Sequence, residues 1–205
     1  MNTQTETTTL AGSLPALTEL FRLAALYVSD DPNRKQILGH VKLAGTVEQI
    51  TAQATDAFAA ITYTTDQVSM NGPTIYLPAD EIAAALTAAT RTIGKRAARN
   101  EDAKIEATGD TWALTAGPVE IHGHHTPPAN WPNIDQLYTP AEPNHQPYTM
   151  SAEQLVRLAK TGEHITHTHT NPTKPNHYTT RTNHGQGYTR ATMVGTEGCQ
   201  AARWS

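Results

Sequence analysis

The sequence from Asn33 to Tyr63 reads NRKQILGHVKLAGTVEQITAQATDAFAAITY and carries the clearest structural pattern of the chain. Apolar and polar residues alternate in three runs within it, at 37–43, 47–54 and 58–63. Alternation with a period of two predicts successive β-strands that bury one face. Between the second and third runs, Thr55-Asp56 offers two short polar side chains that can bond nearby backbone amides and turn the chain. The stretch therefore predicts a strand meander with a polar corner.

Helical periodicity flanks this meander on both sides. A first helix is predicted to begin at Ser13, a good N-cap residue, and to stop at Asp30-Asp31-Pro32. A second is predicted from near Pro78 to about Arg99, and its apolar stripe consists of Ile82, Leu86, Ala89 and Ile93. Shorter runs predict further strands at 66–70, 74–77, 103–107, 111–116 and 119–122. The predicted order from residue 13 to 122 is helix, strands, helix, strands.

The second predicted helix carries the most concentrated positive charge. Arg91, Lys95 and Arg99 recur at four-residue spacing, and Arg96 is close by. A solvated helix face is the ordinary explanation of such a pattern. The chain as a whole has a net charge of −4 and an isoelectric point near 6.2, which excludes a basic coat that binds nucleic acid or anionic membrane indiscriminately. Any contact with DNA must therefore come from a local basic surface.

Length and composition set further bounds. The 205 residues suffice for one large or two small domains, with 38% hydrophobic and 6% aromatic residues. The single cysteine, Cys199, excludes an internal disulfide and a paired-cysteine zinc site. Residues 1–12 have neither a basic start nor a long apolar run, so we expect a disordered tail rather than a signal peptide or membrane span. The cytoplasm is the expected location.

Two separated motifs resemble the bacterial β sliding clamp family, the DNA polymerase III beta subunit that tethers the replicative polymerase to DNA. The first runs from Asp31 and Arg34 to the turn Ala54-Thr55-Asp56, and the second from Trp131-Pro132 to Leu137. The family has Gly and Arg where this chain has Ala57 and Ala59. The resemblance covers about residues 14 to 140 and is to a short, divergent member of a kind that a bacteriophage genome could encode.

This resemblance implies an α+β fold with the DNA-clamp topology. It implies one clamp-like module at 13–140, followed at 141–205 by a partial second module with one helix and two or three strands. Bacterial clamps carry three full modules in each subunit, so the usual dimeric ring does not follow from this sequence. The resemblance does imply a homo-oligomer that assembles through sheet edges.

The resemblance also implies two kinds of site. Double-stranded DNA would be bound without sequence specificity, through phosphate contacts from basic residues on helices. The residues expected there are Arg91, Lys95, Arg96, Arg99, Arg157 and Lys160. A groove would bind a short apolar peptide of a DNA polymerase or another replication protein. The residues expected there are Thr55, Ala57, Phe58, Ala59, Met193 and Val194. The ordinary explanation of Phe58 and Met193 is that they are core residues.

The sequence contains no recognisable nucleophile elbow, phosphate loop or metal motif, so we expect no enzyme and no cofactor. Two histidine clusters could attract a metal ion, but no carboxylate or thiolate completes either set locally, and exposed polar histidines are the favoured explanation. These clusters are His122, His124 and His125, and His164, His167 and His169. The expected function is that of a processivity factor. The alternatives are a clamp-fold adaptor or decoy that binds replication proteins without encircling DNA and, more weakly, a histidine-dependent metal-binding protein.

Overall fold

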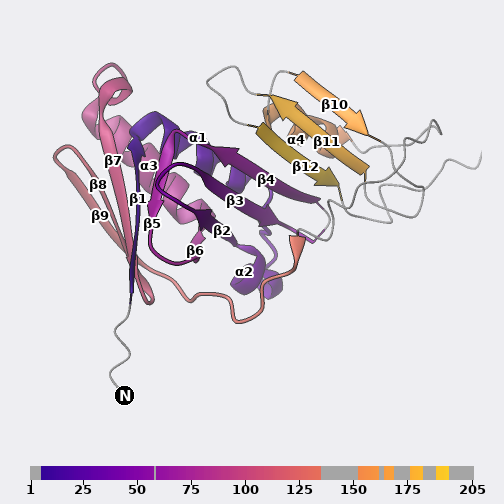
Figure 1. Ribbon diagram of the computed structural model, residues 1–205, viewed down its shortest axis with the longest axis horizontal. Helices are drawn as coiled ribbons and strands as arrows, with labels where there is room; N and C mark the ends of the chain where they lie inside the picture. Colours follow the sequence, from indigo (N-terminus) through magenta and orange to yellow (C-terminus); the bar gives the residue numbers. More distant parts are fainter. Residues whose placement is uncertain are drawn as a thin grey trace, which may run out of the picture.

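The computed structural model describes residues 6–57, 59–134, 152–161, 164–168, 176–181 and 188–193. Two antiparallel sheets are present, with strand orders β5-β1-β7-β8-β9 and β10-β11-β12-β4-β3-β2-β6 (Figure 1). The strands are β1 (Thr7–Ser13), β2 (His40–Gly45), β3 (Ile50–Thr55), β4 (Ala59–Thr65), β5 (Val68–Asn71), β6 (Ile75–Pro78), β7 (Asp102–Thr108), β8 (Thr111–Ala116), β9 (Val119–His124), β10 (His164–Thr168), β11 (Asn176–Arg181) and β12 (Tyr188–Met193). The helices are α1 (Leu14–Ala25), α2 (Pro32–Leu38), α3 (Ala79–Ile93), η1 (Ala98–Asn100) and α4 (Ala152–Thr161).

The first 124 residues contain two similar halves. One half is β1-α1-β2-β3-β4 and the other is β6-α3-β7-β8-β9. Each half lends its first strand to the sheet of the other, because β1 pairs with β7 and β6 pairs with β2. The helices α1 and α3 pack against each other. The two halves are thus interlocked into one module.

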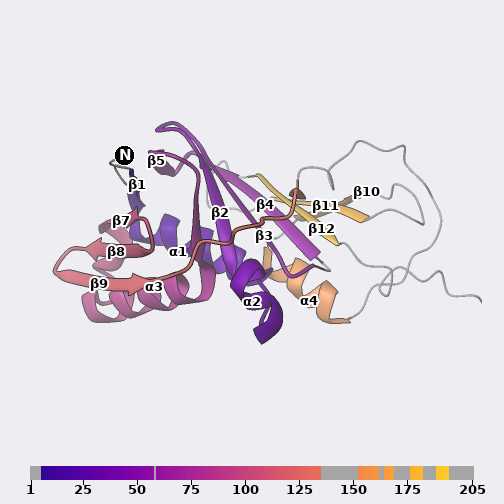
Figure 2. The ribbon, with the colours of Figure 1, turned by 90° about the horizontal axis from the view of Figure 1, so that it is seen from below.

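The core lies between the sheets and the helices, which occupy one side of the strands (Figures 1 and 2). Leu17, Leu20 and Phe21 of α1 are fully buried, as are Ile82 and Leu86 of α3. These are the apolar stripes expected from the helical periodicity, so both predicted helices are confirmed. The N-cap at Ser13 is confirmed too, because its hydroxyl accepts a hydrogen bond from the Ala16 N–H at 3.3 Å.

The strand predicted at 37–43 is wrong at its start, because the helix α2 occupies residues 32–38. The Asp31 carboxylate accepts a hydrogen bond from the Asn33 N–H at 2.9 Å, and Pro32 occupies the first turn. Both features favour helix initiation and outweigh the alternation of the following residues. The strand β2 begins only at His40.

The predicted tail at residues 1–12 is wrong from Thr7 onward. Strand β1 lies between β5 and β7 and pairs with both, and Thr8 and Leu10 are fully buried. A threonine-rich stretch with little apolar content has no obvious core face in the sequence. Partners more than 50 residues away supply its backbone hydrogen bonds.

The predicted extent of the second helix is also wrong. Helix α3 ends at Ile93, and Gly94 follows with a left-handed φ of 88°. The Gly94 N–H donates to the Thr90 carbonyl at 3.0 Å, as is usual where glycine closes a helix. Lys95 therefore lies beyond α3, and Arg99 lies in the separate short helix η1.

The helix and strands predicted after residue 150 are present and extend the larger sheet. Strand β12 pairs antiparallel with β4, from Tyr188 opposite Thr64 to Met193 opposite Ala59. The sheet therefore continues from the first module into the unit α4-β10-β11-β12 (Figure 1). Among the described residues, no helix has the length and apolar composition needed to cross a bilayer.

Candidate functional site

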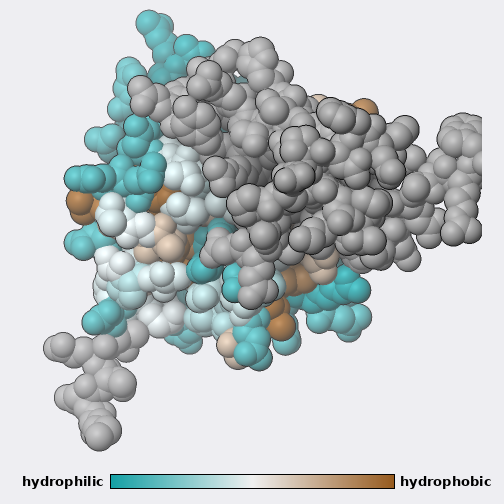
Figure 3. Space-filling view, turned by 45° about the vertical axis from the view of Figure 1, so that its right-hand side comes forward, coloured by the Kyte–Doolittle hydropathy of each residue, from teal (hydrophilic) through white to brown (hydrophobic). Residues whose placement is uncertain are grey.

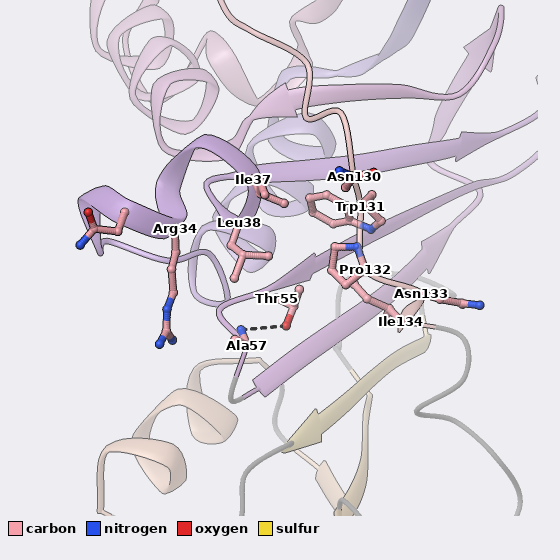
Figure 4. A pocket seen from close by; sticks show the side chains of 11 residues that line it. Arg34, Ile37, Leu38, Thr55, Ala57, Asn130, Trp131, Pro132, Asn133 and Ile134 are labelled. Atoms are coloured by element: carbon pink, nitrogen blue, oxygen red, sulfur yellow. Dashed lines mark hydrogen bonds between the residues drawn. The ribbon is translucent and has the colours of Figure 1, made fainter.

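An apolar groove of 550 Å³ lies where α2, the turn after β3 and residues 130–134 meet. We call it the Thr55 groove. Figure 4 shows that its lining side chains come from these three segments, with Ile37 and Leu38 facing Trp131 and Pro132. They belong to Asn33, Arg34, Ile37, Leu38, Thr55, Ala57, Asn130, Trp131, Pro132, Asn133 and Ile134. The two segments that carry the clamp motifs thus face each other across one cavity.

The turn between β3 and β4 is held by its own side chains. The Thr55 hydroxyl donates to the Ala59 carbonyl at 2.8 Å and accepts from the Ala57 N–H at 3.2 Å (Figure 4). The Asp56 carboxylate accepts from the Ala59 N–H at 2.7 Å. The predicted polar corner is confirmed. It also holds Ala57 at a left-handed φ of 79°, a conformation that suits glycine and is strained for alanine.

The opposite wall is the segment 130–134. The Trp131 ring packs on Tyr76 of the edge strand β6, with ring centroids 5.4 Å apart. Ile134 is almost fully buried and anchors the end of the segment. Trp131 belongs to the second of the two sequence motifs. The structure shows that the packed ring also lines the groove.

Helix α2 supplies the third wall, which sequence reasoning missed. Ile37 is a large apolar side chain that remains 38% exposed, and it faces the cavity beside Leu38 (Figure 4). The available signal was Asp31-Pro32, a capping residue followed by a proline suited to the first helical turn. Exposed apolar surface in a concave site is typical of a place where another molecule binds.

A second cavity, of 710 Å³, shares Ile37 and Asn130 with the Thr55 groove and contains a histidine pair. The rings of His40 and His125 lie 6.1 Å apart, centroid to centroid. Burial lowers the pKa of both histidines, and their mutual proximity lowers that of His40 further. Both rings are therefore neutral at pH 7, and they sit where the chain enters the 130–134 segment.

The predicted peptide-binding residues have different positions. Thr55 and Ala57 line the groove, whereas Ala59 is fully buried in β4. The backbone of Met193 pairs with Ala59. Phe58 and Val194 lie outside the described residues, as does the side chain of Met193.

The predicted DNA-binding residues fall into two groups. Arg91, Lys95, Arg96 and Arg99 are all exposed around the C-terminal end of α3, and none forms an ion pair within the described part of the chain. Lys160 is exposed at the end of α4. These five cations are accessible to a polyanion.

Arg157 differs from these cations because its side chain is only 19% exposed. Its guanidinium donates to the Asp56 carboxylate and lies 5.5 Å from the ring centre of Tyr27. Nearby, the Arg22 guanidinium donates to the Lys160 carbonyl at 3.2 Å. These contacts attach α4 to α1 and to the turn beneath the groove.

The histidine clusters do not assemble a metal site among the residues described. His122 bonds the Glu120 carboxylate at 3.1 Å, and His124 is exposed. No group of three His, Cys, Asp or Glu side chains suited to a metal ion occurs in this part of the chain. His169 and the side chains of His164 and His167 lie outside it.

No protein-family model and no curated protein matches the sequence. Solved structures do match. The H. pylori beta clamp in complex with diflunisal superposes with a TM-score of 0.70 at 9% identity, over 91% of this chain and 65% of that one. The C. crescentus beta sliding clamp gives 0.69 at 10% identity, over 95% and 67%. A. fulgidus PCNA bound to the C-terminal region of FEN-1 gives 0.62 at 10% identity, over 91% and 97%.

The chain has the fold of a sliding clamp. It spans 64% of the length of the Thermotoga maritima DNA polymerase III beta subunit, with a TM-score of 0.67 at 12% identity. The α+β clamp topology expected from the two motifs is therefore confirmed. At such identities the likeness establishes the fold, and the two surfaces described above carry the functional argument.

Proposed function

We propose that this chain is a sliding-clamp-like processivity factor of the cytoplasm. It holds a DNA polymerase or another replication protein by a short peptide in the Thr55 groove, and it contacts the backbone of double-stranded DNA through exposed basic residues. The observation that carries the proposal is the groove itself, because the two clamp motifs meet there around an open apolar cavity. Such a tether works by contacts and topology and needs no catalytic group.

The groove suits an apolar peptide anchor. Ile37, Leu38, Trp131 and Pro132 offer apolar surface on facing walls, and a cavity of 550 Å³ is within the usual range of ligand pockets. Burying a few large side chains in such a pocket supplies most of the affinity of a short peptide. The hydrogen bonds of Thr55 and Asp56 fix the turn that forms the floor of the groove. Peptide binding therefore costs little conformational entropy of the protein.

The DNA contact is proposed for Arg91, Lys95, Arg96, Arg99 and Lys160. Exposed cations of this kind bind phosphate oxygens without reading bases, which gives weak, salt-sensitive binding compatible with sliding. Arg157 is left out of the proposed DNA contacts, because its guanidinium donates a hydrogen bond to Asp56. A homo-oligomer is proposed as well. The end strand β9 of the five-stranded sheet offers an edge at which a second copy could pair.

The groove is tested with a fluorescein-labelled peptide that carries two or three consecutive Leu and Phe residues. We expect its anisotropy to rise on titration with the protein, with at least a tenfold loss of affinity in Ile37→Asp, which places a charge in the apolar cavity. Val47→Asp is the matched control, because Val47 is 67% exposed in the β2–β3 turn and is not among the groove residues. Equal binding by all three proteins would refute the groove assignment.

A further inference from the structure

Helix α4 presents an apolar stripe to solvent. Leu155 and Val156 are 57% and 53% exposed, and Ala152 and Ala159 are exposed beside them. At 100° per residue these four side chains fall within an arc of about 100°. Arg157 leaves the helix outside this arc and is directed to Asp56. The stripe therefore faces away from the contacts that attach α4 to the first module.

Two opposite charges border this stripe on the same flank. Glu153, in the first turn, and Lys160, in the last, are both exposed, and helical spacing places them within about 20° of each other around the axis. The Glu153 side chain is 83% exposed, and its nearest cation in the described chain is Arg157 at 3.4 Å. The helix thus carries a negative charge near its start and a positive charge near its end.

We propose that the stripe on α4 is covered by α4 of a second copy, in an antiparallel pair related by a two-fold axis near Val156. A two-fold axis perpendicular to both helices makes the second helix run in the opposite direction. It also keeps the charged flanks of the two helices on the same side of the contact. Glu153 of one copy then lies level with Lys160 of the other, and the same pair forms twice. Leu155, Val156, Ala152 and Ala159 close the apolar contact between these ion pairs.

The charge pattern favours a second copy over an unrelated partner. A two-fold parallel pair would place the charged flanks of the two helices on opposite sides of the contact and leave Glu153 and Lys160 without an opposite charge from the other copy, whereas the antiparallel pair matches both charges. The chain already contains a related arrangement, because the helices of its two similar halves, α1 and α3, pack against each other. This interface uses neither the Thr55 groove nor the basic residues after α3. It shares only Lys160 with the proposed DNA contacts, so a failure of the helix pairing leaves the rest of the proposed function standing.

The size of the contact sets its expected strength. Two ten-residue helices bury well under the roughly 1,200 Å² that is typical of a stable protein interface. We therefore expect α4 pairing by itself to show a dissociation constant in the range of about 10 to 100 μM. The association must be measured over a concentration series that includes this range.

Disulfide trapping tests the geometry directly. In the full chain with Cys199→Ser, Val156→Cys places a thiol close to the two-fold axis, where two copies can meet the Cα separation of about 4 to 7 Å that a disulfide requires. We expect mild oxidation to give a covalent dimer within minutes. Val47→Cys in the same background is the control for random collision. Equal or slower dimer formation by Val156→Cys would overturn the proposal.

Charge exchange tests the partner. By sedimentation equilibrium, we expect Lys160→Glu to weaken self-association at least fivefold, because it sets like charges against each other twice. The double variant Glu153→Lys/Lys160→Glu should restore association, since the complementary pairs re-form with exchanged signs. The antiparallel pair would be excluded if Lys160→Glu associates as tightly as the parent. It would also be excluded if the double variant associates no more tightly than Lys160→Glu. Circular dichroism verifies that each variant is folded.

Discussion

The guanidinium of Arg157 on α4 donates a hydrogen bond to the carboxylate of Asp56, the residue at the centre of the turn that forms the floor of the Thr55 groove. The two residues are 101 positions apart. The same carboxylate holds the Ala59 N–H, so one side chain fixes both the turn and the position of α4. Arg157 is therefore assigned to the attachment of α4 and not to DNA contact.

We expect Arg157→Ala to lower the free energy of unfolding by about 1–3 kcal/mol, because it leaves a mostly buried carboxylate without its charged donor. Arg157→Lys should recover part of this loss, since an ammonium keeps the charge but not the planar fork. Urea denaturation measures both. The DNA affinity of Arg157→Ala should fall less than that of Arg91→Glu. A larger loss of DNA affinity in Arg157→Ala would show that Arg157 contacts DNA.

Replacing Ala57 with glycine should stabilise the protein. The left-handed φ of 79° is costly for alanine, and relief of that cost outweighs the greater freedom of glycine in the unfolded chain, for a net gain of up to about 1 kcal/mol. Ala84→Gly, at an exposed position within α3, is the matched control and should lose about 1 kcal/mol. Destabilisation in both variants would show that the turn is not strained.

Salt dependence tests the proposed DNA contacts. Each phosphate contact contributes about −0.9 to the slope of log K against log salt, so Arg91→Glu, Lys95→Glu and Arg99→Glu should each flatten that slope by about one. Lys42→Glu on β2 makes the same change of charge on a strand and should leave the slope nearly unchanged. Fluorescence titration of a random 20-base-pair duplex gives the slopes. Indistinguishable slopes in all variants would exclude phosphate contacts at these residues.

The His40–His125 pair predicts loss of stability in acid. Both histidines have a pKa below the ordinary 6.5 in the folded protein, so the unfolded chain binds more protons as the pH falls. Their contribution is complete above pH 6.5 and is lost as the pH falls below that value through the folded pKa. Thermal unfolding between pH 7.5 and 5 should show this decline.

The variant His125→Gln should show a shallower decline over the same pH range. His122→Gln, at an exposed position on β9, is the control and should follow the parent. Peptide affinity for the Thr55 groove should fall together with stability, because His125 lies where the chain enters the 130–134 segment. A parent protein as stable at pH 5 as at pH 7.5 would contradict this role of the pair.

Sequence reasoning predicted the fold where local periodicity and tertiary packing agree. The stripes containing Leu17 and Ile82, and the polar corner at Thr55-Asp56, were identified because each is specified by neighbouring residues. Strand β1 could not be found in this way, since its partners β5 and β7 are distant in the chain. On the face shown in Figure 3, the brown hydrophobic residues form small, separate groups among teal and white ones, so surface hydropathy there gives little guidance either.

The candidate site was only partly predictable for the same reason. Thr55 and Ala57 were found through the motif that contains them, whereas the wall formed by Ile37 depends on a helix that the alternating pattern concealed. In the sequence, Gly94 lowers the helix propensity of the predicted second helix without marking its end. Only its left-handed φ shows that α3 ends there and that Arg91, Lys95 and Arg99 do not share one helix face. Both errors arose where a capping interaction outweighed periodicity.

The most direct test of the proposed tether is single-hit primer extension by a DNA polymerase that carries the apolar peptide at its C-terminus. The primed template is long and linear, because a closed ring can pass onto the DNA over its free ends. The account predicts products several-fold longer with this protein, a gain that Val47→Asp keeps and Ile37→Asp loses. Product lengths that do not change on addition of the protein, although the peptide binds, would contradict the processivity role and leave the non-encircling adaptor as the function.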